Sequence, residues 1–275
     1  MTPTAKSLIL DLLIATGGAP LPARLAVVAG ALFDVSENNV RVALARLSAT
    51  GLIEVGERGT YRIAPGAEGL AREVSSWHTV EDRVRSWKGG YVAVHCGSLG
   101  RTDRSELRRR ARALSMQGFA ELGREFYVRP DNLKGGVESV RTRLYGLGLE
   151  REASVFAAQS FEPELEARAR TLWDGKALTL SYKRTRAELE HWLLGAGTLE
   201  PDVAARESFL LGGRAIRQIV YDPLLPPPLV DVDARRAFID TMKQMDREGR
   251  RLWRRFFDST ESRATFRTEV ERHAP

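Results

Sequence analysis

The chain has 275 residues, a formal net charge of +6 and a single cysteine, Cys96. This length suits two or three domains, and one cysteine excludes an internal disulfide framework. No apolar run approaches the roughly 20 residues that span a bilayer, and no signal peptide begins the sequence. We therefore expect a soluble, cytoplasmic protein that makes no contact with a membrane.

Two helices are predicted near the start of the chain. Apolar residues recur at helical spacing from Pro22 to Ala31, and a second helix runs from Glu37 to about Thr50 and ends at Gly51. The hydroxyl of Ser36 can cap the second helix by accepting a hydrogen bond from a backbone N–H in its first turn. An alternating hairpin over residues 52–63 follows, with its turn between two glycines. Helix, turn, helix and hairpin in this order predict a winged helix-turn-helix that binds double-stranded DNA.

The second helix is the predicted recognition helix. Val40, Leu44 and Leu47 share one face and should pack inward. The opposite face and its flanks carry amide, small and guanidinium side chains, which suit base edges in the major groove. The alternative is an ordinary exposed helix face, and the hairpin arginines could be solvated. The candidate DNA-binding residues are Ser36, Asn38, Asn39, Arg41, Val42, Ala45, Arg46, Arg58 and Arg62.

Charge does not by itself support DNA binding by this segment. Residues 1–65 carry six basic and five acidic side chains, whereas residues 83–112 carry nine basic and two acidic ones. The basic excess includes a predicted helix in which Leu107, Ala111 and Leu114 should pack on a sheet. Arginines on another face of that helix could contact DNA phosphates, could face the phosphates of a small-molecule effector, or could be solvated. These arginines are Arg101, Arg104, Arg108 and Arg112.

The middle of the chain predicts a strand, a helix, two strands, a helix and a strand. Their ranges are residues 91–94, 103–116, 118–122, 125–128, 132–147 and 153–157. This order is typical of a ferredoxin-like domain. From Pro163 onward the sequence predicts helices, the last from Val232 to about Phe257.

The resulting fold class is α+β with four consecutive parts. We expect a winged helix-turn-helix at residues 1–68, a helical connector at 69–88, a ferredoxin-like domain at 89–160 and a helical C-terminal domain at 161–275.

Several sequence runs, in this order, resemble the PaaX family of bacterial repressors of aromatic-acid catabolism. They are Arg41-Val42-Ala43-Leu44-Ala45-Arg46-Leu47, Gly51-Leu52, Leu107-Arg108-Arg109, Gly118-Phe119-Ala120-Glu121-Leu122, Phe126-Tyr127-Val128-Arg129-Pro130 and Tyr221-Asp222-Pro223-Leu224-Leu225-Pro226. The resemblance implies the same three-domain architecture, a homodimer, and an aryl-CoA thioester such as phenylacetyl-CoA as effector. Two family features are replaced here, by residues 213–217 and by residues 227–231 without a Trp, so the ligand of this chain could differ.

The candidate effector residues come from two regions. They are Arg101, Arg104 and Arg108 of the basic helix, with Phe209, Arg214, Arg217 and Tyr221 of the helical domain. Packing in the core is the favoured role of the two aromatic residues, since helices carry aromatics mainly for packing. The predicted mechanism is ligand binding between the middle and C-terminal domains, which changes the separation of two recognition helices in a dimer.

Two other functions compete with an effector-released repressor. One is a constitutive DNA-binding protein whose remaining domains bind proteins. The other is a metal-dependent nuclease of the CRISPR-adaptation type, which would need an aspartate where the first strand of the middle domain ends. That position reads Val94-His95-Cys96-Gly97. Without a carboxylate there, and without a catalytic or nucleotide-binding motif, we expect no enzyme activity, no cofactor and no metal.

Overall fold

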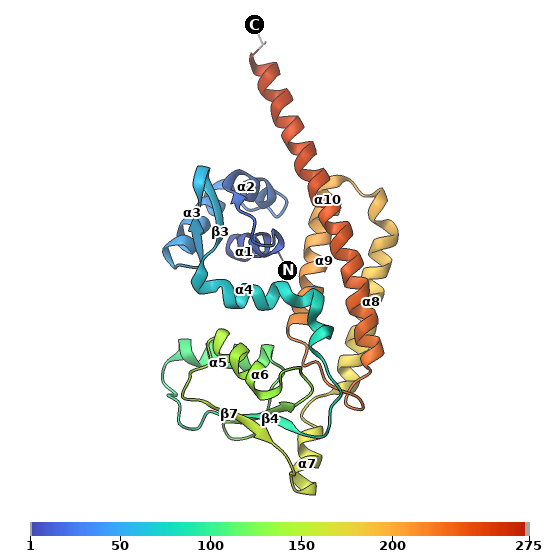
Figure 1. Cartoon of the computed structure of the whole chain (residues 1–275). Coiled ribbons are helices and arrows are strands. Elements are labelled where there is room, and N and C mark those ends of the chain that lie inside the picture. The colour runs from blue at the N-terminus through green and yellow to red at the C-terminus, as the bar shows by residue number, and fades with distance from the viewer. Residues whose placement is uncertain (1, 273–275) are drawn as a thin grey trace. The chain divides into compact units, whose positions relative to one another are not determined.

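The computed structural model describes the backbone of residues 2–272 and the side chains of residues 2–259. They form a mixed α/β protein with two small antiparallel sheets and a helical C-terminal region (Figure 1). Two compact units are each assembled from separate stretches of chain. The first takes residues up to Ser75, Glu188–Ala215 and residues from Thr241 onward, and the second takes Ser76–Ala187 and Ile216–Asp240. The predicted division into four consecutive domains stays a prediction.

The first unit begins with four helices and a three-stranded sheet. The elements are α1 (Ala5–Ala15), β1 (Leu21–Pro22), α2 (Ala23–Ala31), α3 (Glu37–Ala49), β2 (Ile53–Val55), β3 (Thr60–Ile63) and α4 (Glu68–Ser75). The sheet order is β1-β3-β2, and Val55 lies opposite Tyr61 in the β2–β3 hairpin. Helix α1 had no counterpart among the predicted elements. Eight of its eleven residues are apolar, which obscures the spacing of its buried face.

The core of the first unit joins the start of the chain to its end. Leu8 and Ile9 of α1 are fully buried with Val40 of α3. Side chains from the long helices α9 (Pro201–Val220) and α10 (Val232–Arg272) pack against this core, among them Phe209 and Trp253. The unit is therefore completed by residues about two hundred positions downstream of its first helices.

The second unit contains a four-stranded sheet. Its elements are β4 (Tyr91–His95), α5 (Arg104–Met116), β5 (Ala120–Gly123), β6 (Phe126–Pro130), α6 (Gly136–Gly146), β7 (Ser154–Ala158), α7 (Pro163–Arg170) and part of α8 (Gly175–Gly195). The strand order is β5-β6-β4-β7 and all neighbours are antiparallel. The order of strands and helices along the chain is the predicted one.

Both faces of this sheet are covered around β4. Helices α5 and α6 lie on one side of the sheet and α7 lies on the other (Figure 1). Tyr91 and Ala93 pack with Ala169 of α7, while Val92 and Val94 project from the opposite face and are fully buried. A strand buried on both faces reads as a continuous apolar run, as residues 91–94 do.

Three predicted details differ in the structure. Helix α6 begins four residues later than expected, because Gly135 and Gly136 adopt positive φ angles of 79° and 51°. Helix α10 continues beyond Phe257 to Arg272. On α5 the predicted packing of Ala111 is wrong, since its side chain is exposed while Arg110 and Ala113 are buried.

Candidate nucleic-acid interface

Helix α3 is fixed in its rotation by a cap and a buried stripe. The hydroxyl of Ser36 accepts a hydrogen bond from the backbone N–H of Asn39, at 3.3 Å. Val40, Leu44 and Leu47 are each at most 2% exposed, as the sequence predicts. Because side chains repeat about every 100° around a helix, burial of this stripe leaves the opposite face in solvent.

The outward face of α3 carries unpaired polar groups. The exposed residues on it and its flanks are Asn38, Asn39, Arg41, Val42, Ala45 and Arg46. Among the described residues, Asn38, Asn39 and Arg46 have no side-chain hydrogen bond or ion pair. Val42 is 39% exposed although it is apolar. Amide and guanidinium groups read adenine and guanine edges in the major groove, and an apolar side chain contacts the thymine methyl group.

The remaining candidate arginines of the first unit differ in their partners. Arg41 pairs with Glu37 at 2.6 Å, and Arg62 pairs with Glu54 on the neighbouring strand. Both pairs lie in solvent, where such interactions contribute at most about 1 kcal/mol and are easily exchanged for a phosphate. Arg58 is exposed at the hairpin turn with a φ of 53°, and no described carboxylate pairs with it.

The basic helix α5 presents its arginines to solvent. Arg104, Arg108 and Arg112 are exposed, and no ion pair holds them within the described part of the chain. Arg101, in the loop before the helix, lies 3.5 Å from the carboxylate of Glu125. Three free guanidinium groups spaced four residues apart form a positively charged face along the helix.

The other candidate effector residues each have a contact within their own unit. Phe209 packs against Phe33, with ring centroids 5.1 Å apart, so it has the core role that the sequence favours. Arg214 lies 3.8 Å from Glu188. The guanidinium of Arg217 lies over the ring of Tyr221, 5.3 Å from its centroid. No described hydrogen bond or ion pair joins Arg217 or Tyr221 to the arginines of α5.

A buried polar junction in the second unit was not predicted from the sequence. Arg129, on β6, is 1% exposed, and its guanidinium donates hydrogen bonds to the backbone carbonyls of Gln117 and Pro223. It also donates to Oδ1 of Asn132, at 3.1 Å, and Asn132 Nδ2 donates to the carbonyl of Leu224, at 2.6 Å. Two of the runs that resemble the PaaX family therefore meet at this point, and Gln117 directly precedes a third. The sequence feature that could have indicated this junction is Arg129 followed by Pro130 at the end of an apolar strand.

The Asp222 carboxylate extends the same junction. It accepts a hydrogen bond from the backbone N–H of Leu224 at 2.8 Å, and burial raises its pKa despite the nearby Arg235. Arg235 itself is fully buried and donates to Glu81 at 2.6 Å and to the carbonyl of Leu225 at 2.8 Å. These bonds attach the segment after α9 to the sheet and to residues before β4.

Cys96 lies directly after β4. Cys96 is buried, and burial raises the pKa of its thiol to about 11. Among the described residues, no group of three or more His, Cys, Asp or Glu side chains is placed to hold a metal ion. In the same residues no helix is both long enough and apolar enough to pass through a bilayer.

Comparisons with known proteins place the C-terminal part of the chain. Residues 173–255 match the family described as PaaX-like protein C-terminal domain. One solved structure, the uncharacterized protein Rv0674 from Mycobacterium tuberculosis, is similar in fold, with a TM-score of 0.55 and 23% sequence identity over 90% of this chain and 98% of that one. No curated protein matches the chain. The match bears out the resemblance to the PaaX family for residues 173–255, which include the run Tyr221-Asp222-Pro223-Leu224-Leu225-Pro226.

Proposed function

We propose that this protein is a transcriptional regulator that binds double-stranded DNA through a winged helix-turn-helix made of α2, α3 and the β2–β3 hairpin. The observation that carries the proposal is the outward face of α3. Asn38 and Arg46 are exposed and unpaired there, on a helix whose rotation is fixed by its cap and its buried stripe. Side chains that are held by a rigid element and lack internal partners are suited to base contacts.

The PaaX-like C-terminal domain supports a repressor rather than another kind of DNA-binding protein. The family resemblance implies regulation of aromatic-acid catabolic genes by a homodimer on a two-fold operator. A dimer places its two recognition helices about 34 Å apart, one turn of B-DNA. In this proposal α3 enters the major groove, and Arg58 and Arg62 contact the backbone or the minor groove beside it.

The DNA proposal is tested by fluorescence anisotropy with labelled duplexes from the intergenic region upstream of the gene. Asn38→Ala and Arg46→Ala should each weaken binding to the specific duplex by roughly tenfold, which corresponds to about 1.4 kcal/mol. Arg206→Ala is the matched control, because Arg206 is also exposed in the first unit and has no described ion pair. Equal binding by all three variants would exclude α3 as the reading element.

For the effector, we propose an aryl-CoA thioester whose binding releases the protein from its operator DNA. The free arginines of α5 could face the phosphates of such a ligand, so Arg104→Ala should weaken the response to phenylacetyl-CoA and leave operator affinity unchanged. If this variant instead flattens the slope of log affinity against log salt concentration, by about 0.9 for each phosphate no longer neutralised, α5 belongs to the DNA interface. If phenylacetyl-CoA and other acyl-CoA thioesters leave operator binding unchanged, the result would favour the alternative of a constitutive DNA-binding protein.

A further inference from the structure

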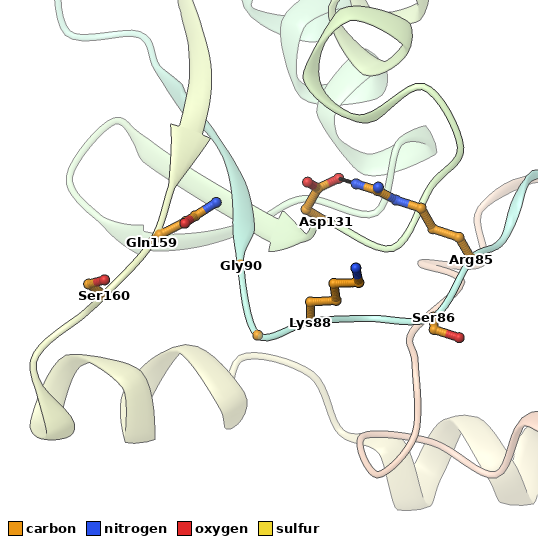
Figure 2. Close-up of a pocket in the computed structure, with 8 residues that line it drawn as sticks. Arg85, Ser86, Lys88, Gly90, Asp131, Gln159 and Ser160 are labelled. Atoms are coloured by element: carbon orange, nitrogen blue, oxygen red, sulfur yellow. Dashed lines mark ion pairs between the residues drawn. The ribbon is translucent and has the colours of Figure 1, made fainter.

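A polar hollow of about 470 Å³ lies at one end of the four-stranded sheet (Figure 2). It is bounded by the residues before β4, by Asp131 directly after β6, and by Gln159 and Ser160 directly after β7. We call it the Lys88 hollow, after the lysine in its wall. Its volume falls in the range of small-molecule sites, which is about 300–1,000 Å³.

The walls of the hollow are held in place by hydrogen bonds. The indole N–H of Trp87 donates to the carbonyl of Gly90 at 2.6 Å, and the backbone N–H of Asp131 donates to the same carbonyl at 2.9 Å. The guanidinium of Arg170 lies 5.0 Å from the centroid of the Trp87 ring. These contacts hold the backbone at Gly90 and the Trp87 ring in place without any ligand.

The hollow carries one uncompensated positive charge. The guanidinium of Arg85 is paired with Asp131 at 2.8 Å, so these two charges offset each other. Lys88 is exposed and has no ion pair with any described residue, and its ammonium group points into the hollow toward that pair (Figure 2). An ammonium group in such a position attracts an anion.

Other residues that line the hollow carry neutral hydrogen-bonding groups. Ser86 and Ser160 bring hydroxyl groups and Gln159 brings an amide, while Gly89 adds no side chain to the space. Gly89 has a φ of 87°, a conformation that side-chain-bearing residues rarely adopt, and a Cβ placed there would touch nothing within 4 Å. The lining of the hollow is thus more polar than apolar.

We propose that the Lys88 hollow binds a small oxyanionic ligand, with a phosphate or carboxylate group on Lys88 and hydrogen bonds from hydroxyl and amide groups elsewhere in its lining. A charge-assisted hydrogen bond to an ammonium group is the strongest contact that this lining offers. The site differs from every residue assigned above to DNA or effector binding, and it does not depend on the proposed DNA-binding function.

The test detects anion binding at the Lys88 hollow by the NMR signal of the Gly89 amide in the whole chain. The chain contains two Lys-Gly pairs, Lys88-Gly89 and Lys134-Gly135. Labelling lysine with ¹³C at the carbonyl and glycine with ¹⁵N therefore gives two amide signals, and a Lys134→Arg variant identifies the one from Gly89. Sodium phosphate, sodium pyrophosphate and sodium citrate are titrated separately at an ionic strength held constant with sodium chloride. We expect the Gly89 signal to move and saturate with at least one of them.

Affinities of variants are compared by isothermal titration calorimetry with the same anions. Lys88→Met should weaken binding roughly tenfold or more, since it removes a charged hydrogen-bond donor. Lys176→Met is the matched control, an exposed lysine of the same unit with no described ion pair. Saturation by phosphate or pyrophosphate alone assigns a phosphorylated ligand, and saturation by citrate alone assigns a carboxylate. Signal changes that follow sodium chloride, or binding that survives Lys88→Met, would overturn the proposal.

Discussion

Arg110 and Glu150 form an ion pair that is mostly shielded from water. The closest oxygen lies 2.5 Å from the guanidinium nitrogen, and the side chains are 4% and 19% exposed. The hydrogen bond from Arg110 lowers the pKa of Glu150 below its ordinary value of 4.5. A carboxyl whose pKa is lowered by folding stabilises the protein above its unfolded pKa, and this stabilisation is lost as pH falls through the folded pKa.

We therefore expect Glu150→Gln to lower the free energy of unfolding at neutral pH by roughly 1.5–3 kcal/mol. The difference from the wild type should shrink as the pH falls below about 4.5, the ordinary pKa of the group. Urea unfolding at several pH values measures it. Glu138→Gln is the control, because Glu138 is 79% exposed in its pair with Arg141 and should change stability little. A pH-independent loss in Glu150→Gln would contradict the ion-pair account.

Cys96 gives a second prediction for a single residue. The thiolate is the reactive form of cysteine, and the pKa of about 11 means that little of it exists at neutral pH. Because the thiol is also buried, we expect a disulfide reagent such as Ellman's reagent to modify the folded protein far more slowly than the urea-unfolded protein. Equal rates in the two states would show that the end of β4 is open to solvent.

Individual residues could be predicted where their environment is local in sequence. Ser36 and the apolar stripe of α3 were predicted because a cap and its helix are adjacent in the chain. Ala111 was predicted wrongly, since the rotation of α5 also depends on Glu150, forty residues away from Arg110. Arg129 was missed because the carbonyl of Pro223 that accepts its hydrogen bond lies 94 residues downstream. Short-range sequence patterns give no information on partners that lie so far away in the chain.

At the scale of elements, Gly118 controls how closely the segment after α9 approaches the sheet. Its φ is 71°, and a Cβ placed there would lie 2.6 Å from the Cα of Pro223 and 2.9 Å from the carbonyl oxygen of the same residue. Both atoms belong to the backbone, so neither can move aside as the tip of a side chain can. A side chain at this position would separate two elements that the hydrogen bonds of Arg129 hold together.

We expect Gly118→Ala to destabilise the protein by roughly 2–5 kcal/mol, from the cost of the positive φ and from overpacking. Thermal unfolding measures the change. Gly146→Ala is the matched control, because Gly146 lies in helix α6 of the same unit and a Cβ there meets nothing within 4 Å. The control should be neutral or slightly stabilising, since alanine favours a helix by up to about 1 kcal/mol over glycine. Similar values for both variants would contradict the close approach.

Element order was easier to predict than the candidate sites. Strands and helices of the second unit follow from short-range periodicity, and each was found close to its expected range. The Lys88 hollow, in contrast, depends on three loop segments that meet only after the sheet has formed. Loop residues such as Lys88 and Gln159 show no periodicity that distinguishes them from other polar surface residues. Their proximity is a property of the strand order β5-β6-β4-β7.

At the scale of the whole molecule, the aromatic side chains near the end of the chain stabilise the unit that contains α3. Trp253 lies 5.9 Å from Phe209 between ring centroids, and Phe209 lies 5.1 Å from Phe33. We expect Trp253→Ala to lower the stability of this unit by roughly 2–4 kcal/mol through the loss of aromatic packing. Faster hydrogen exchange at the backbone amides of α1 and α3 should report it.

The control for this prediction is Trp192→Ala. Trp192 is also half-buried in the first unit, but it donates a hydrogen bond to Glu207 at 2.9 Å and is not part of the cluster around α1 and α3. It should leave the exchange of the α3 amides close to that of the wild type. If both tryptophan variants raise exchange in α3 equally, the effect is a general loss of stability and not a specific contact.

The packing of Phe209, Trp253 and Phe257 on the core of the first unit also has a consequence for synthesis. A ribosome releases the chain from its N-terminus, and domains commonly fold as they emerge. Here α1 and α3 leave the ribosome while Trp253 is still untranslated, so their apolar core stays partly uncovered until α10 has been translated. A ribosome-bound nascent chain that ends before α10 should therefore bind chaperones.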